Sequence, residues 1–199
     1  MAKYLKDFLS KVRLYVQITR VDEIARRYFV MNGFDGSMTT LGVILGSWIL
    51  GNSDPRLVVM TGLGACFAMG VSGFFGSYMA ERAESRRRLK MLEESLLSNL
   101  NDSLYEDASR FASLFAALIN GLSSILTAII SLIPFLLVIL NLLIIWDAYL
   151  ISFAVTFAVL FLLGTYLGRI AEENVLVYGV EMLAAGAVIS IIIFLLGAI

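Results

Sequence analysis

The sequence predicts an all-α integral membrane protein with five transmembrane helices, and three features of its composition support this. Apolar residues make up 59% of the 199 residues and charged residues only 16%, whereas soluble domains are about half apolar and a quarter charged. The mean hydropathy is +0.87. The chain has only two prolines, which favours long helices over a turn-rich β architecture.

Five runs of the chain are apolar enough to cross a bilayer, which requires about 20 mostly apolar residues. We expect these transmembrane helices at Tyr28–Gly51, Leu57–Ala80, Phe111–Leu137, Ala148–Gly168 and Leu176–Ala198. Pro134 is expected to bend or end the third helix, because proline removes a backbone donor and clashes with the preceding turn. The next turn then falls within Asn141–Asp147, where Trp146 and Tyr149 are typical of an aromatic belt at the membrane interface.

The distribution of basic residues predicts the orientation. Of the 15 lysines and arginines, all but Arg56 and Arg169 lie in residues 1–27 and 81–110. The positive-inside rule places both segments in the cytoplasm, with the N-terminus inside and the C-terminus outside. An even number of spans would put a basic segment on the wrong side. The charged N-terminus does not resemble a cleavable signal peptide, and we expect the protein in a prokaryotic plasma membrane.

Two segments are expected outside the bilayer, apart from the helices in residues 28–80 and 111–199. In residues 1–27, apolar residues recur at roughly helical spacing between basic ones: Leu5, Phe8, Leu9, Val12, Val16 and Ile24. This pattern predicts an amphipathic helix that lies on the membrane surface or packs on the protein's own cytoplasmic segment. Residues 81–110 lack glycine and proline. They predict a continuation of the second helix followed by a short return helix.

Asp35 is the most informative residue, because a charge within a transmembrane helix costs a few kcal/mol and usually faces the protein or water. Asn32, Asp35, Thr39, Gly42 and Gly46 follow steps of three and four residues, so they share one helical face. Oxygen ligands on such a face suit a hard or borderline divalent cation. The alternative is that Asp35 caps its helix at the interface.

Further candidate metal ligands lie on the second helix. Met69 offers a thioether and Ser72 a hydroxyl on a face of small residues, for which helix packing is the alternative role. Glu81 and Glu84, one turn apart, could bind a divalent cation or form surface ion pairs with neighbouring arginines. Glu181 is an isolated carboxylate near the fifth helix, where it could pair with Arg169 or cap that helix.

The chain lacks the combinations of residues that common catalytic sites need, which argues against an enzyme. Gly70–Gly73 spells the GxSG of intramembrane serine proteases, but such a serine needs a basic partner and the chain has no histidine. The sequence offers no nucleotide-binding loop and no intramembrane acid–base pair. We expect no catalytic residue, no bound cofactor and no nucleic-acid partner.

Four stretches give the chain a resemblance to the vacuolar iron transporter family: FDGSMTTLGVILG in the first helix, SGFFGSYMAERAE in the second, SLIPFLL late in the third and GVEMLAAGAVISIIIFLLG in the last. The resemblance implies a homodimer that exports Fe²⁺ or Mn²⁺ from the cytoplasm. It also implies a path between the first helices of the two copies, lined by the aspartate that Asp35 matches.

The second helix departs from the family pattern Ser-Met-x-x-Gly-Glu-Tyr. In this chain Gly73 replaces the methionine and Ser77 replaces the glutamate. Two hypotheses therefore stay open. One is a divalent-metal transporter, with Asp35 as the carboxylate of the path and as the candidate for proton coupling. The other is a membrane scaffold or partner subunit that keeps the fold without the metal ligands.

Overall fold

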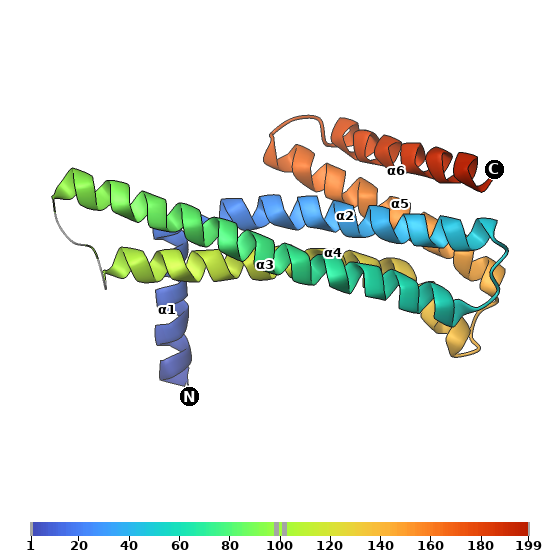
Figure 1. The fold of residues 1–199 in the computed structure, drawn as a ribbon, viewed down its shortest axis with the longest axis horizontal. Helices are drawn as coiled ribbons and strands as arrows, with labels where there is room; N and C mark the ends of the chain where they lie inside the picture. The colour runs from blue at the N-terminus through green and yellow to red at the C-terminus, as the bar shows by residue number, and fades with distance from the viewer. Residues whose placement is uncertain (1, 98–99, 101–102, 199) are drawn as a thin grey trace. The chain divides into compact units, whose positions relative to one another are not determined.

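The protein is described here from a computed structural model, which covers residues 2–97, 100 and 103–198, with side chains from Ser10 onward. Every regular element in this part of the chain is an α-helix (Figure 1), so the predicted all-α fold is confirmed. The helices are α1 Ala2–Thr19, α2 Val21–Ile49, α3 Pro55–Leu96, α4 Leu104–Ile139, α5 Ile145–Ile170 and α6 Val175–Gly197.

The chain divides into two compact units. Unit 1 comprises Met1–Phe29 and Val71–Gly121, and unit 2 comprises Val30–Gly70 and Leu122–Ile199. Unit 1 therefore contains α1, the start of α2, the second part of α3 and the first part of α4. Unit 2 contains the rest of these three long helices together with α5 and α6.

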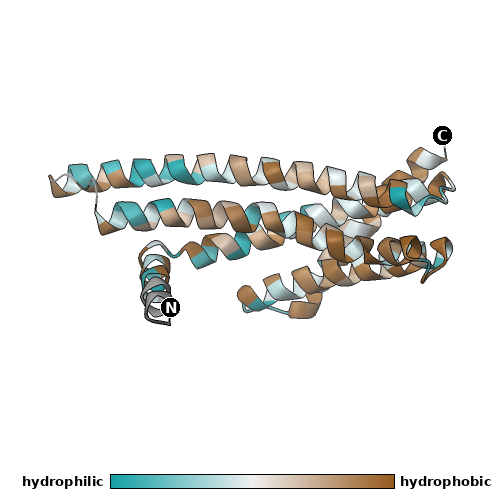
Figure 2. Cartoon of the chain, turned by 90° about the horizontal axis from the view of Figure 1, so that it is seen from below, coloured by the Kyte–Doolittle hydropathy of each residue, from teal (hydrophilic) through white to brown (hydrophobic). Residues whose placement is uncertain are grey.

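Four helices in the described part of the chain, α3 to α6, are long and apolar enough to cross a membrane. The protein is therefore an integral membrane protein, and four of the five predicted spans have matching helices. Helix α2 is long but does not reach this apolarity, because Asn32, Asp35 and several threonines and glycines interrupt its apolar residues. Figure 2 shows the contrast with α5 and α6, which are hydrophobic over most of their length.

The N-terminal helix is shorter than predicted. Helix α1 ends at Thr19, and Arg20 adopts a left-handed backbone conformation (φ 50°) before α2 begins at Val21. Residues 21–27 thus belong to α2. Val16 packs on a cluster around Val21 and Ala112 in unit 1, so the end of α1 packs on the protein itself. The side chains of the first nine residues lie outside the described part.

The segment predicted between the second and third spans, residues 81–110, contains the end of α3 and the start of α4. Helix α3 continues without a break to Leu96, as expected, whereas the return segment is no separate helix but the first turns of α4. Residues 98–99 and 101–102 lie outside the described part. Pro134 lies within α4, which continues to Ile139, so the helix does not end at this proline. Membrane helices tolerate an internal proline where other groups satisfy the backbone carbonyl that it leaves open.

The predicted aromatic belt of Trp146 and Tyr149 is wrong for Tyr149, which lies in the core of unit 2. The α4–α5 turn falls where the sequence predicted it, with Asn141 in a left-handed conformation (φ 60°). Trp146 is 52% exposed, but Tyr149 is 1% exposed. The Tyr149 hydroxyl donates to the Asn52 carbonyl (3.0 Å), and its ring packs edge-on against Phe135. Tyr149 is therefore a core residue, because its hydroxyl finds a partner in the connection between α2 and α3.

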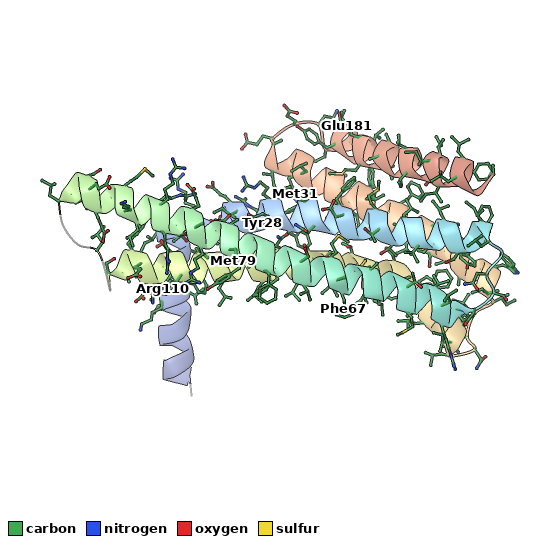
Figure 3. The ribbon with its side chains drawn as sticks, viewed as in Figure 1. Tyr28, Met31, Phe67, Met79, Arg110 and Glu181 are labelled. Atoms are coloured by element: carbon green, nitrogen blue, oxygen red, sulfur yellow. The ribbon has the colours of Figure 1, made fainter. Side chains whose placement is uncertain are left out.

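Helices α5 and α6 pack closely against each other at positions where one of them carries a glycine. A Cβ added to Gly164 would lie 2.8 Å from the Gly179 Cα, and one on Gly179 would lie 2.5 Å from Phe161 Cε2. Such contacts between small residues let membrane helices approach closely. Asn174 caps α6 by accepting from the Leu176 N–H (3.0 Å). Glu181 (Figure 3) is exposed and is not the cap.

Candidate functional site

The polar stripe predicted from the sequence lies on one face of α2, which we call the outer face: Asn32, Asp35, Thr39, Gly42 and Gly46. Asp35 is exposed and the other four are half-buried. A Cβ added to Gly46 would meet no atom within 4 Å, whereas one on Gly42 would lie 3.5 Å from Ile193 of α6. Much of this face is therefore uncovered in the single chain.

The opposite face of α2, the inner face, is formed by Gly33, Gly36, Ser37 and Thr40 and is buried in unit 2. A Cβ on Gly36 would collide with the backbone of α4, at 2.7 Å from the Ser124 Cα. The Thr40 hydroxyl donates to the Gly36 carbonyl (2.8 Å) and lies 3.5 Å from Cys66 Sγ on α3. These contacts fix the rotation of α2, and that rotation turns Asp35 outward.

Asp35 lies well inside α2, which begins at Val21, so the alternative that it caps the helix is wrong. No hydrogen bond or ion pair of its carboxylate occurs among the described residues. A carboxylate at membrane depth is costly unless water, an ion or protein surrounds it. The outer face thus presents a carboxylate, an amide and a hydroxyl, the oxygen ligands that hard divalent cations take.

The candidate ligands of α3 fall in both units. Met69 is half-buried in unit 2, with Asp35, and Ser72 is exposed in unit 1. Within the described residues no three carboxylate or thiol side chains gather into a group that could hold a metal ion. A site on the outer face would therefore depend on one carboxylate per chain, and the roles of Met69 and Ser72 stay predictions.

Glu81 and Glu84 each have a protein partner within unit 1. Glu81 accepts a hydrogen bond from the Tyr28 hydroxyl (2.9 Å), and the Arg27 guanidinium lies 5.6 Å from the centre of the Tyr28 ring. Glu84 accepts from Arg88 Nε (3.3 Å) in an exposed i,i+4 pair. The second contact is the surface ion pair that the sequence offered as an alternative to metal binding.

Ser77 occupies the position where the resembling family has glutamate. This serine is buried, and its hydroxyl donates to the Gly73 carbonyl (2.6 Å) one turn earlier. The side-chain amide of Asn120 on α4 donates to the same carbonyl (2.9 Å). The Asn120 bond therefore connects α4 to α3 within unit 1, whereas Ser77 bonds within α3 and contributes no carboxylate.

Two structural features were not predicted from the sequence. The Tyr28–Glu81 hydrogen bond joins residues 53 positions apart, and no local pattern marks it. The second is a row of buried hydroxyls in unit 2: Ser124, Thr127 and Ser131 on α4, and Ser152 and Thr156 on α5. Ser131 and Ser152 have no hydrogen-bond partner among the described residues. Only the three- and four-residue spacing of the α4 hydroxyls marked this row in the sequence.

Comparisons with known proteins agree with this architecture. Residues 89–198 match the model of the VIT family. A protein of Methanocaldococcus jannaschii, described only as uncharacterized, is 32% identical over 178 residues that cover 87% of this chain and 89% of the relative. No solved structure matches.

Proposed function

This chain belongs to the VIT family, and on that premise we propose that it exports a divalent transition-metal ion, Fe²⁺ or Mn²⁺, from the cytoplasm. Membership of this transporter family indicates metal-ion transport in general and fits a protein that is not an enzyme. The identity of the ion and the direction of transport are our proposal. No resident cofactor is needed, because the metal is the substrate.

The exposed carboxylate of Asp35 carries the proposal. It lies on the outer face of α2, between the half-buried Asn32 and Thr39. Carboxylate, amide and hydroxyl oxygens can replace part of the hydration shell of a divalent cation. Because few charged ligands surround the ion, binding is expected to be weak enough for release. Asp35 is also our candidate for proton coupling, since a carboxylate in a transport path can take up a proton when the metal leaves.

A second copy of the chain is the proposed cover of the outer face. Asp35 has no partner among the described residues, and the open space beside Gly46 leaves room for a helix. Two α2 helices that met along this face would bring two Asp35 carboxylates to one path. The half-site of a single chain would then become a complete site, which is why we propose a homodimer.

The basic residues support the proposed topology. If α2 crosses the membrane as the first of five helices, both basic segments lie on one side, with the N-terminus inside and the C-terminus outside. If only α3 to α6 crossed it, residues 1–27 and 81–110 would lie on opposite sides. We therefore propose five spans and a prokaryotic plasma membrane, in keeping with the archaeal relative.

The second candidate function is a membrane scaffold that has lost transport. The observation that favours it is the second helix, where Gly73 and a buried Ser77 stand in place of the family's methionine and glutamate. Glu81 and Glu84 are also engaged by Tyr28 and Arg88. Under this hypothesis the protein would bind a membrane partner and move no ion.

Reconstitution into liposomes separates the two functions. The purified chain is reconstituted in an established orientation, and entry of Fe²⁺ and Mn²⁺ is followed with a fluorescent indicator inside, with and without a pH gradient. Saturable flux above that of protein-free liposomes, in the direction that corresponds to export, supports the proposal. Absence of flux of either ion from protein shown to be folded and inserted would favour the scaffold.

A further inference from the structure

A cavity of ≈570 Å³ lies between α3 and α4 within unit 1 and belongs to no part of the proposed metal path. Three arginines line it: Arg82 and Arg86 from α3, and Arg110 from α4 (labelled in Figure 3). Because Arg82 and Arg86 are one helical turn apart, their side chains lie on the same face of α3. The cavity therefore gathers positive charge from two helices.

Among the described residues that line the cavity there is one acid, and that acid has a basic partner. Glu106 accepts from Arg110 Nη2 at 2.6 Å. Neither Arg82 nor Arg86 forms an ion pair among the described residues. Nearby on α3, Glu81 is bonded to Tyr28 and Glu84 to Arg88. Two guanidinium groups are thus left to bind an external anion, and their planar, multiple donors suit the oxygens of a phosphate.

The polar wall of the cavity adds hydrogen-bond donors. Ser85 of α3 and Ser113 of α4 both line it, with their hydroxyl oxygens 3.4 Å apart. Ser113 donates to the Ser109 carbonyl (3.0 Å) on its own helix. The Ser85 hydroxyl is therefore the donor in its contact with Ser113, and the hydroxyl of Tyr78, which also lines the cavity, can donate to a ligand there.

Part of the cavity wall is apolar. It lies at the level where both helices change from charged to apolar residues. Arg110 is the last charged residue of α4, and Phe111 and Leu114 follow it into the cavity wall. On α3 the apolar run gives way to charged residues at Glu81. Figure 2 shows the same change of colour along both helices. The cavity thus places arginines beside apolar side chains. An anionic lipid has the same order of groups, with its charged headgroup next to its acyl chains.

We propose that this cavity binds the phosphate headgroup of an anionic phospholipid, held by Arg82 and Arg86, with an acyl chain along Phe111 and Leu114. The proposal does not depend on metal transport. A soluble phosphate could meet the same guanidinium groups, but it would not use the apolar wall. The preference for a lipid therefore rests on that wall and on the position of the cavity along α3 and α4.

The test measures binding to the full-length chain in a neutral detergent. Dihexanoyl phosphatidylglycerol is titrated by native mass spectrometry or by thermal shift, beside dihexanoyl phosphatidylcholine and inorganic phosphate. Two variants are compared with the wild type: Arg82→Gln/Arg86→Gln, and Arg87→Gln/Lys90→Gln. The second removes the same charge from the same helix but leaves the cavity lining intact.

The expected result is binding of phosphatidylglycerol at least about tenfold tighter than of the choline lipid or of phosphate, because charge-assisted hydrogen bonds are strong and the tails use the apolar wall. Binding should weaken at least about tenfold in Arg82→Gln/Arg86→Gln and by less than about twofold in the control. Equal losses in the two folded variants would overturn the site. Phosphate binding as tight as that of the lipid would overturn the assignment to phospholipid.

Discussion

The two faces of α2 are made of similar residues but lie in opposite environments. Both faces carry small or polar side chains at steps of three and four residues. The inner face has Gly36 against the backbone of Ser124 and the Thr40 hydroxyl bonded within the bundle. The outer face leaves Asp35 exposed and Gly46 with open space beside it.

This comparison separates residues that build the fold from residues that remain available for function. On the inner face, each small or polar group is explained by a neighbour in the same chain. On the outer face, the described residues of the chain offer Asp35 no partner, which leaves its carboxylate available to water, an ion or another molecule. The two faces should consequently respond to substitution in different ways.

The largest expected effect on folding is that of Gly36→Leu. The new side chain would have to enter the backbone of α4, which cannot move aside as a flexible side chain can. We expect a loss of about 3 kcal/mol in the free energy of unfolding, or failure to accumulate, since overpacking a well-packed interior typically costs about 1–3 kcal/mol and occasionally more. Thermal unfolding in detergent and yield from membranes measure this. A wild-type melting curve would contradict the close packing of α2 on α4.

A smaller effect is expected for Thr40→Val, which keeps the shape of the side chain but removes its hydroxyl. The variant loses the bond to the Gly36 carbonyl and the contact with Cys66 Sγ. Of these two, the contact with Cys66 joins α2 to α3, and polar contacts between membrane helices contribute about 0.6 kcal/mol on average. Thr39→Val on the outer face is the matched control and should leave stability unchanged. An equal loss in both variants would remove the distinction between the two faces.

The smallest effect on the stability of the single chain is expected for Gly46→Leu. No atom lies within 4 Å of the added Cβ, and leucine favours helix by up to about 1 kcal/mol over glycine. The melting temperature should therefore stay the same or rise slightly. If a second copy covers this face, however, the variant should dimerise less than the wild type, as measured by light scattering in detergent. Unchanged dimerisation would place the dimer interface elsewhere.

Much of the fold could be predicted from the sequence because long apolar runs determine it directly. The boundaries of α5 and α6 lie within three residues of the predicted spans. The first span was predicted from its apolar run like the others, but α2 is less apolar than α3 to α6, so its crossing of the membrane stays a prediction. The break at Arg20 was missed, because the apolar spacing of residues 1–27 continues through it.

The candidate site was only partly predictable, for reasons that concern tertiary contacts. Helical spacing placed Asp35 and Thr39 on one face, but it could not tell whether that face was buried. The rotation of α2 is decided by Gly36 and Thr40, whose neighbours lie on α3 and α4. The sequence also could not show that Tyr28 engages Glu81, nor that Arg82 and Arg86 line a cavity.

The most direct test of the account is the metal flux of Asp35→Asn in liposomes. Asparagine keeps the size of the side chain and removes its charge. Asp22→Asn is the matched control, because it makes the same change on the same helix but in an exposed ion pair with Arg26. We expect flux of Fe²⁺ or Mn²⁺ to fall to that of protein-free liposomes in Asp35→Asn and to persist in the control. Wild-type flux through folded Asp35→Asn would contradict the outer face of α2 as the metal path.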